Sequence, residues 1–313
     1  MLMRRRWVVL WVLAVLVVAG SYLATAPQVR TALPDQVATV DLTNGETMFW
    51  AGGCASCHAA EDSDGEQKLL LGGGLELDTP FGVFAVPNIS PDPEFGIGAW
   101  TDLDFVRAMQ DGVSPSGKHY YPAFPYEYYQ YMTVQDLLDL RGYLQTLPPV
   151  ATPVAASKIA FPYNIRRGIG LWKHVYLSDA PWPQLTDPQL QRGQYLVRGP
   201  GHCGFCHTPR NQFGGLRQQR YLGGAPALEV GADGTPEGRI PNITSHKDGI
   251  GSWAAGDIAF ALETGFDPDY DSFGGTMVAV QENMARLSAD DRAAMAAYLK
   301  TVPPLAAEAD GKP

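Results

Sequence analysis

The sequence predicts an all-α protein in which two tandem helical domains follow an N-terminal transmembrane helix. Three observations lead to this fold class. An uncharged apolar stretch lies near the start of the chain, several segments recur in the same order about 150 residues further on, and no segment alternates apolar and polar residues as a strand does. Of the 313 residues, 45% are hydrophobic and 18% charged, which is typical of a folded protein. The net charge of −10 argues against nucleic-acid binding.

The N-terminal segment, residues 1–26, predicts a membrane anchor or a secretion signal. Three arginines precede the uncharged residues 7–24, which would span about 27 Å as a helix, close to the thickness of a bilayer core. The Ala-Thr-Ala sequence that ends the segment resembles a cleavage site, but Pro27 would follow the cut and resist processing. We therefore favour a retained anchor. In either case the arginines stay in the cytoplasm and the remaining chain is exported.

The recurring segments divide the exported part into two domains, residues 41–149 and 186–305, joined by a connection over residues 150–185. The repeated pairs are residues 51–61 with 199–210, 86–109 with 240–262, and 132–150 with 287–305. An offset this long indicates one domain used twice, and not a short-period solenoid. The connection is rich in proline and aromatic residues, and we expect it to pack against one or both domains.

Capping residues predict where the helices of each domain begin. In each domain a first helix should end just before a cysteine pair, a middle helix should follow, and a closing helix should end at a double proline. Gly265 should end the middle helix of the second domain. The helix starts are marked, in chain order, by Thr101 with Asp104, Thr133 with Asp136, Asp187 with Pro188, and Ser288 with Asp291.

Each domain contains two cysteines separated by two residues, with a histidine directly after the second. These motifs consist of Cys54, Cys57 and His58 in the first domain and of Cys203, Cys206 and His207 in the second. Two thiols on one side of a short helical turn can add to the vinyl groups of one haem, and the adjacent imidazole can bind its iron. A zinc site does not require a histidine directly after the second cysteine. A redox-active cysteine pair would be expected near a βαβ pattern, which this sequence lacks, and the motif positions argue against structural disulfides. The sequence therefore predicts two covalently bound haem c groups.

The sixth ligand of the iron differs between the two domains. In the second domain, Met277 lies in a glycine-bracketed loop before the closing helix and is the expected thioether ligand, with Met284 as the alternative. The corresponding loop of the first domain has Phe124, which cannot bind iron. Met132 is the nearest sulfur and is the expected ligand there, with His119 or a five-coordinate iron as alternatives. The tyrosines around Phe124 should line the haem, form a docking surface, or simply pack the loop.

With these motifs, the chain resembles the multihaem cytochrome c subunits of bacterial membrane-bound dehydrogenases of the alcohol, gluconate and sugar dehydrogenase type, which contain class I cytochrome c domains. The resemblance covers about residues 40–305. It depends on "CASCH", "PNISPD…GIGAWTDLDFVRAMQDGVSPSG", "YPAFPY", "CGFCH" and "PNIT…GIGSW". Many of these subunits carry three haem motifs where this chain has two, and they read "YPAMPY" where this chain reads "YPAFPY".

The resemblance implies roles for further residues. In class I cytochromes c a proline carbonyl accepts the Nδ1 proton of the haem histidine, and this role falls to Pro87 and Pro241; the alternative is a simple proline-ended turn. Trp100 and Trp253 occupy matching positions, and we expect them to line the haem pockets with an N–H reaching a propionate, or to pack the core.

The resemblance also implies a function in electron transfer at the periplasmic side of the bacterial inner membrane. Such subunits pass electrons from a substrate-oxidising partner towards a quinone, a cytochrome or an oxidase. We therefore expect a relay of single electrons between a dehydrogenase subunit and the respiratory chain, and not a catalyst alone. The main alternative is a dihaem peroxidase that binds peroxide at an open first haem. A haem-based ligand sensor is a weaker alternative.

Overall fold

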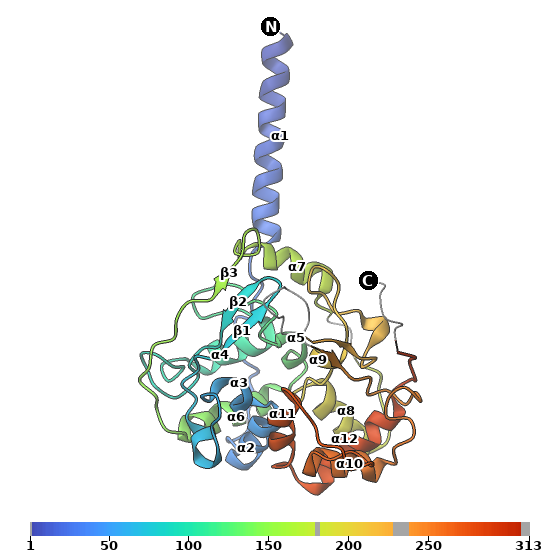
Figure 1. Ribbon diagram of the computed structural model, residues 1–313. Helices are drawn as coiled ribbons and strands as arrows, with labels where there is room; N and C mark the ends of the chain where they lie inside the picture. The colour runs from blue at the N-terminus through green and yellow to red at the C-terminus, as the bar shows by residue number, and fades with distance from the viewer. Residues whose placement is uncertain (1, 179–181, 228–237, 308–313) are drawn as a thin grey trace.

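A computed structural model describes residues 2–178, 182–227 and 238–307. The first helix, α1 Leu2–Ala24, stands away from a rounded body that contains the other described elements (Figure 1). Within the described residues, the segment Arg4–Ala24 is the one helix long and apolar enough to cross a membrane. Its mean hydropathy is 2.3, and none of it is buried. The predicted apolar N-terminal helix is confirmed, and its length and composition make it a candidate span.

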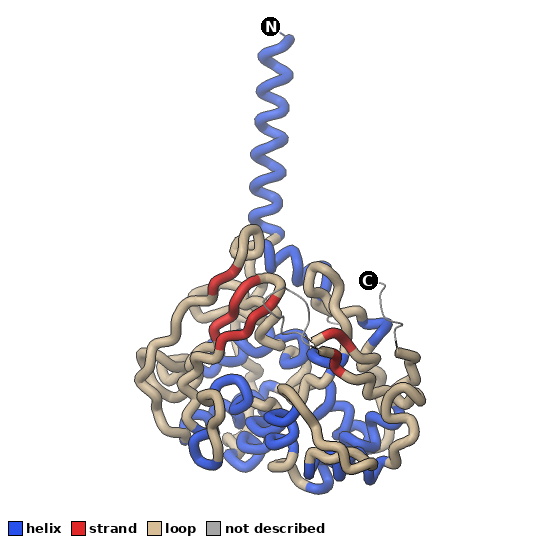
Figure 2. Tube along the Cα trace, viewed as in Figure 1, coloured by secondary structure: helices blue, strands red, loops and turns tan. Residues whose placement is uncertain are grey.

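The body is built mainly of short helices and long loops, as predicted (Figure 2). The first half contains α2 Leu42–Ala51, α3 Cys54–His58, η1 Gly65–Leu69, β1 Glu76–Thr79, β2 Gly82–Ala85, α4 Asp102–Val106, the π-helical turn η2 Arg107–Asp111, α5 Tyr126–Tyr129 and α6 Val134–Thr146. The connection contains β3 Lys158–Ile159 and α7 Gly168–Tyr176. The second half contains α8 Pro188–Arg198, α9 Gly204–His207, η3 Gln218–Arg220, β4 Ala225–Pro226, β5 Arg239–Ile240, α10 Ala255–Thr264, α11 Met277–Met284 and α12 Ala289–Thr301.

The same helix pairing occurs in both halves. In the first half α2 packs along α6, and in the second half α8 packs along α12. A glycine allows the close approach in each case. A Cβ atom on Gly45 would lie 2.1 Å from the carbonyl oxygen of Asp139, and one on Gly193 would lie 1.9 Å from that of Ala294. Any larger residue at either position would push the paired helices apart.

The predicted helix ends are confirmed by their caps. Thr101 and Asp104 form a capping box before α4, in which each side chain accepts the backbone N–H of the other at 3.1 Å. Gly265 ends α10 with a left-handed φ of 79°. The other predicted N-cap side chains that accept a backbone N–H are Thr133, Asp187 and Ser288. Helices therefore begin at the positions that local side-chain chemistry dictates.

Two small sheets contradict the expectation that the body has no strands. Strand β1 pairs antiparallel with β2, and β2 with β3, while β4 pairs antiparallel with β5. The strands are only two to four residues long, too short to show an alternating pattern in the sequence. Because β3 belongs to the connection, this segment packs against the first half, as expected.

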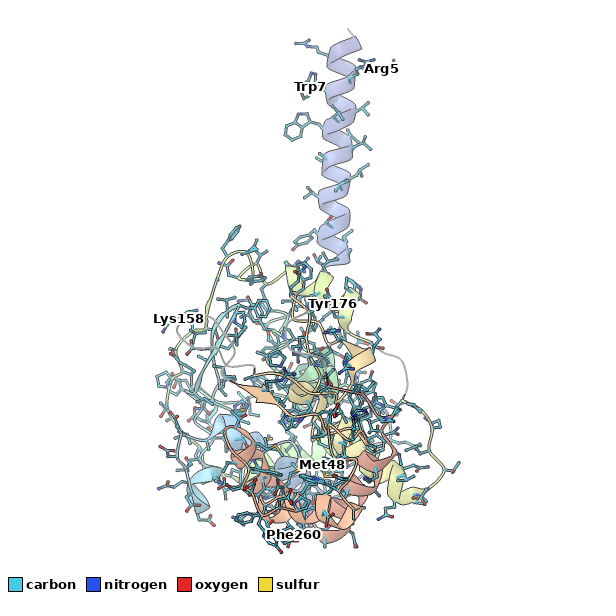
Figure 3. All side chains as sticks on the ribbon, turned by 45° about the vertical axis from the view of Figure 1, so that its right-hand side comes forward. Arg5, Trp7, Met48, Lys158, Tyr176 and Phe260 are labelled. Carbon is cyan, nitrogen blue, oxygen red and sulfur yellow. The ribbon has the colours of Figure 1, made fainter. Side chains whose placement is uncertain are left out.

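One hydrophobic core runs through both halves. Met48 and Leu137 from the first half belong to the same buried cluster as Leu196 and Met295 from the second, and none of the four is more than 1% exposed. Figure 3 marks Met48 deep in the body, at the end away from α1. The two halves therefore fold onto each other, and each lends apolar side chains to the shared core.

Candidate haem-binding sites

The first cysteine–histidine motif occupies the short helix α3. Gly53 starts this helix in the left-handed conformation, with a φ of 59°. The ring of His58 places Nδ1 2.7 Å from the carbonyl oxygen of Pro87. Because a carbonyl only accepts, Nδ1 carries the ring proton and Nε2 keeps its lone pair for a ligand. Burial also lowers the pKa of His58 to about 4, although the hydrogen bond to Pro87 opposes this. The imidazole is therefore neutral, as metal binding requires.

The second motif repeats this geometry in α9. His207 Nδ1 lies 2.8 Å from the carbonyl oxygen of Pro241, which fixes the same tautomer. Burial lowers the pKa of His207 as well, against the opposing effect of the same hydrogen bond. The backbone N–H of Gly224 donates to the His207 carbonyl at 2.9 Å, as that of Gly73 donates to the His58 carbonyl at 2.8 Å. Both histidines are held in place by equivalent backbone contacts.

The first cysteine of each motif is suited to a thioether bond more than to thiolate chemistry. All four cysteines are free thiols. Burial, followed by the charge of the neighbouring thiol, raises the pKa of Cys54 and of Cys203 to about 12. Reactive or zinc-bound cysteines need the opposite shift, whereas thioether formation adds a whole S–H group across a vinyl double bond. Within the described residues, no group of three or more His, Cys, Asp or Glu side chains could hold a metal ion by itself. The donor set fits haem c.

An asparagine after each proline holds the histidine-binding loop. In the first half, Asn88 Nδ2 donates to the carbonyl oxygens of Val150 at 2.7 Å and Thr152 at 3.2 Å, and Asn88 Oδ1 accepts the N–H of Ser90 at 2.9 Å. These bonds tie the proline loop to the chain beyond α6. Sequence analysis assigned a role to the proline alone, although "PNI" occurs at both sites and pointed equally to the asparagine.

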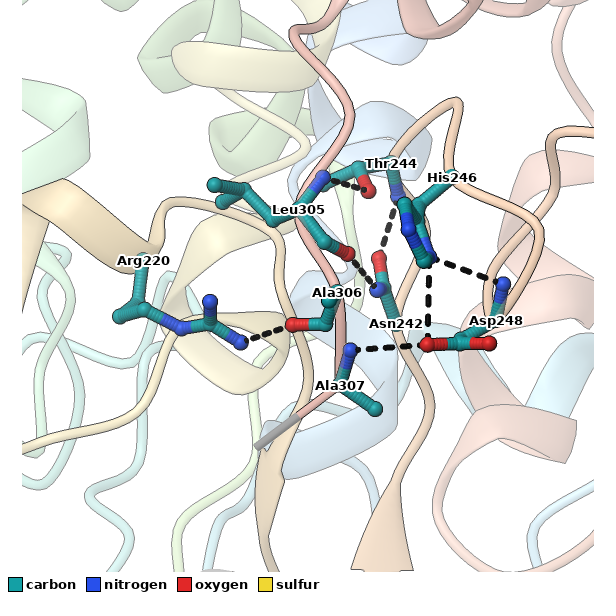
Figure 4. A network of polar contacts seen from close by, with 8 residues as sticks. All are labelled: Arg220, Asn242, Thr244, His246, Asp248, Leu305, Ala306 and Ala307. Carbon is teal, nitrogen blue, oxygen red and sulfur yellow. Dashed lines mark hydrogen bonds and ion pairs between the residues drawn. The ribbon is translucent and has the colours of Figure 1, made fainter. Parts of the chain in front are cut away.

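The second loop is held in the same way, with additional polar contacts around it (Figure 4). Asn242 Nδ2 donates to the Leu305 carbonyl at 2.6 Å, and Asn242 Oδ1 accepts the N–H of Thr244 at 2.8 Å. The N–H of Leu305 donates in turn to Thr244 Oγ1 at 3.1 Å. Arg220 also donates to the Ala306 carbonyl at 2.6 Å. The chain beyond α12 thus fixes the loop that carries Pro241.

The two predicted tryptophans lie in matching turns. The backbone N–H of Trp100 donates to the Ile97 carbonyl at 3.1 Å, and that of Trp253 to the Ile250 carbonyl at 3.2 Å. Both side chains are partly buried and pack against the shared core. They occupy equivalent positions in the two halves, which is compatible with either expected role.

The two methionines considered for the second iron share one face of α11. Met277 is the first residue of this helix and is partly exposed, whereas Met284 is 3% exposed and belongs to the core. They are seven residues apart, close to two helical turns, and so point in nearly the same direction. Asn283, next to Met284 in the sequence, makes the contact with Ser56 of the first half.

No methionine occupies the corresponding place in the first half. The ring of Phe124 packs instead against the rings of Tyr120, Tyr126 and Tyr129, with centroids 5.5, 6.4 and 5.6 Å away. This arrangement favours aromatic packing of the loop. Met132 is 3% exposed and lies directly before the cap of α6.

The two candidate ligands for the first iron, Met132 and His119, contact residues outside the first half. The Met132 Cγ atom lies 3.8 Å from the point where a Cβ of Gly199 would be, so its side chain reaches the second half. His119 is buried, and its Nε2 lies 3.0 Å from the Thr25 carbonyl beside the end of α1. That contact leaves only Nδ1 of His119 available to another partner.

At the interface between the halves, each half contacts the helix that carries the motif of the other. Helix α11 lies against α3: Asn283 Nδ2 donates to Ser56 Oγ, which lies 3.2 Å from the carbonyl oxygen of Ala279 (Figure 1). Helix α5 lies against α9 in the same manner. A Cβ on Gly204 would lie 2.7 Å from the hydroxyl oxygen of Tyr128. The arrangement is therefore reciprocal.

Tyr129 lies between the two motifs. Its hydroxyl group donates to the Gly52 carbonyl at 3.4 Å, just before the first cysteine pair. Its ring centroid is 5.5 Å from that of His202, which directly precedes Cys203. Burial strongly raises the pKa of Tyr129, so the phenol stays protonated at neutral pH. Sequence analysis placed this residue only within a tyrosine cluster, because no sequence pattern indicates a contact between the halves.

Comparisons with known proteins show the family of this chain. Residues 42–148 match the family described as Cytochrome c. A protein of Cereibacter sphaeroides named diheme cytochrome c-type is 50% identical over 270 residues, which cover 85% of this chain and 87% of that protein. The cytochrome c subunit of the quinone-type alcohol dehydrogenase of Gluconacetobacter polyoxogenes is 34% identical over 92% of this chain. The cytochrome c subunit of gluconate 2-dehydrogenase from Pantoea cypripedii is 34% identical over 86% of it.

The chain spans only part of these dehydrogenase subunits, 59% of the first and 61% of the second. It spans most of the diheme protein, and the first half matches the family on its own. Covalently bound haem c and electron transfer are the properties that this family implies. The chain belongs to the cytochrome c family and is related to the cytochrome c subunits of bacterial dehydrogenases.

Proposed function

We propose that the protein is a dihaem cytochrome c, anchored by α1 in the bacterial inner membrane with its body in the periplasm, that passes single electrons from a dehydrogenase subunit towards the respiratory chain. The observation that carries this proposal is the pair of equivalent motifs, each on a helix that the other half contacts. His58 and His207 have equivalent proline partners, Pro87 and Pro241, and Tyr129 contacts residues that closely precede the two motifs. Two redox groups attached there would lie close enough to exchange electrons.

In this proposal each half is one cytochrome c domain. The thiols Cys54, Cys57, Cys203 and Cys206 form the thioether bonds, and His58 and His207 bind the two irons. The bound haem supplies reversible one-electron chemistry at iron. The residues of the chain hold each imidazole in a single tautomer, keep it neutral and place it in an apolar surrounding, which together adjust the potential. Met277 is the proposed sixth ligand in the second half, and Met132 in the first.

A redox titration of the purified full chain tests the relay. With soluble mediators, both haems should be reduced and reoxidised reversibly. Two separate midpoint potentials are expected because the first half has the aromatic cluster around Phe124, and the second half has α11, before its closing helix. A haem that cannot be cycled would contradict the proposal. Rapid turnover of added peroxide would instead support the dihaem peroxidase, for which the absence of methionine at Phe124 is the motivating feature.

The partner is tested with a dehydrogenase that oxidises alcohols, aldonic acids or sugars, the substrate types named by the relatives. Each catalytic subunit is mixed with the oxidised full chain, and its substrate is then added. Reduction of the haems in the presence of one substrate and its enzyme identifies the donor. Failure with all three classes would reject this group of donors and leave the reversible redox behaviour unaffected.

A further inference from the structure

The connection between the halves places α7 against the end of α1. A Cβ on Gly170 would lie 2.4 Å from the carbonyl oxygen of Thr25, so the two segments touch at the backbone. Arg167 donates to the Tyr22 carbonyl at 2.7 Å, and its guanidinium carbon lies 4.0 Å from the centroid of the Tyr22 ring. Helix α7 is thus fixed at the level at which α1 leaves the body (Figure 1).

This part of the connection exposes large apolar side chains. Phe161 is 78% exposed, Ile165 54%, Leu171 60% and Val175 63%. Leu171 and Val175 are four residues apart and therefore share one face of α7. We refer to these four residues as the collar. Figure 3 marks Tyr176, the last residue of α7, just below the base of α1. Four large apolar side chains exposed within residues 161–175 indicate a surface that water does not normally cover.

A groove between α1 and α7 joins the surface of α1 to Leu171 of the collar. It is lined by Val17, Val18 and Tyr22 of α1 and by Leu171 of α7. Val17 and Val18 are 66% and 69% exposed, and they belong to the segment that is apolar enough to cross a membrane. Whatever medium surrounds these two valines also fills the groove and contacts Leu171. If α1 spans the bilayer, Leu171 is at the depth of lipid.

The charged residues beside the collar agree with such a position. Arg166 and Arg167 directly precede α7, whereas the whole chain has a net charge of −10. Arginines at the end of a membrane span can bind lipid phosphates while apolar neighbours enter the acyl region. The aromatic residues of α1 also agree with a membrane span, because Trp and Tyr are common at both membrane–water interfaces. Trp7 and Trp11 lie near one end of α1 and Tyr22 near the other, and all three are at least 62% exposed.

We propose that the collar lies at the boundary between the headgroups and acyl chains of the leaflet from which α1 emerges, so that the body is held against the membrane in one orientation. This inference rests on the proposed membrane anchoring by α1. Two attachments, the spanning helix and the collar, remove the freedom to swivel that a single helix would leave. The two haem-binding halves would then keep a constant height above the bilayer.

Photolabelling of the full chain in liposomes tests this inference. The liposomes contain phosphatidylglycerol, phosphatidylcholine and a phospholipid with a diazirine in its acyl chain, and labelled peptides are identified by mass spectrometry after irradiation. We expect label both in α1 and in residues 161–175. The double variant Leu171→Glu with Val175→Glu should lose at least nine-tenths of the label in residues 161–175 and keep that in α1. Phe260→Glu is the matched control: this residue is 43% exposed at the far end of the body, and its change should leave both labels intact (Figure 3).

Each outcome separates the collar from the anchor. Label in α1 without label in residues 161–175 overturns the collar and leaves the anchor standing. Equal labelling of residues 161–175 in the double variant also overturns it, because the apolar face would then not be responsible. Absence of label from α1 as well contradicts the proposed anchoring and the collar together. The haem absorption spectrum, unchanged in each variant, shows that the body is folded.

Discussion

The two halves hold their histidines alike and differ in the segment that we propose supplies the sixth ligand. His58 and His207 lie 2.7 and 2.8 Å from their proline carbonyls. Before its closing helix, the first half has an aromatic cluster around Phe124, whereas the second half has α11 with Met277 at its start. The histidines are held by backbone carbonyl groups, which remain when side chains are substituted. The proposed sixth ligand is one methionine sulfur atom, and a single substitution removes it.

Removal of the thioether bonds from one half at a time is the most severe test of this comparison. We expect Cys54→Ser with Cys57→Ser to lose half of the covalently bound haem, and Cys203→Ser with Cys206→Ser to lose the other half. The protein should also unfold at lower denaturant concentration, because the haem supplies much of the packing of the affected half, which shares one core with the other. Haem content per chain is measured by haemochrome absorbance and by intact-mass spectrometry. A double variant that retains all its haem would refute the assignment of two attachment sites.

Replacement of the methionines should separate the two irons by potential. Met277→Leu should lower the midpoint potential of one haem by a substantial part of the span of about 0.8 V that axial ligands command. Met284→Leu is the control on the same face of α11 and should change the potential little, because its side chain packs the core. Redox titration measures both variants. A larger shift in Met284→Leu than in Met277→Leu would identify Met284 as the ligand instead.

The corresponding experiment in the first half replaces Met132. If Met132 binds the first iron, Met132→Leu lowers the other midpoint potential and leaves the one affected by Met277→Leu unchanged. Unchanged potentials in Met132→Leu would reject this ligand. Carbon monoxide binding to the reduced first haem of the unaltered protein would then indicate an open iron. An absence of binding, together with a shift in Met132→Leu, would support the sulfur.

The motifs and helix ends could be predicted from the sequence, whereas the contacts between the halves could not. The motifs and the prolines are contiguous or repeated, and the caps of α4, α6, α8, α10 and α12 depend on residues within one turn. The contacts between the halves join residues far apart in the chain, such as Tyr128 with Gly204 and Ser56 with Asn283. No local pattern predicts these. The short strands were missed for a related reason, since two to four residues carry too little periodicity.

The reciprocal contacts between the halves differ in charge, and this provides a third test. On the side of α9, Glu127 is paired with Arg210 at 3.2 Å, and their side chains are 4% and 15% exposed. On the side of α3, the contact is a neutral one between Asn283 and Ser56. Glu127→Gln removes the charge that balances the buried guanidinium, which keeps its bond to the Gly214 carbonyl at 2.7 Å. We expect a loss of about 3–5 kcal/mol in the free energy of unfolding.

Asn283→Ala should cost only about 1–3 kcal/mol, because it removes a neutral hydrogen bond at the equivalent place. Urea unfolding followed by haem absorbance measures both variants. It should be done at pH 8, because burial raises the pKa of Glu127 despite the opposing charge of Arg210. Equal losses in the two variants would contradict the inequality of the two contacts.

The smallest expected effect concerns the residue before each cysteine pair. The first half has Gly53 at this position, whereas the second has His202 with a positive φ of 34° and rings of Tyr129 and Phe205 beside it. Burial lowers the pKa of His202, and its hydrogen bond with the Pro200 carbonyl only partly opposes this. The unfolded chain therefore binds a proton at His202 before the folded one does. Stability should fall as the pH drops below about 6.5 and continue to fall until the lower folded pKa is passed.

Two replacements isolate this contribution. His202→Asn tolerates the left-handed backbone and does not titrate, and His202→Gly restores the residue that the first half has. Since other groups titrate equally in all three proteins, the advantage of the unaltered protein over either variant should shrink between pH 7 and pH 5, as measured by urea unfolding at each pH. A constant difference would mean that His202 is neutral or charged alike in both states, and that the two halves respond to acid in the same way.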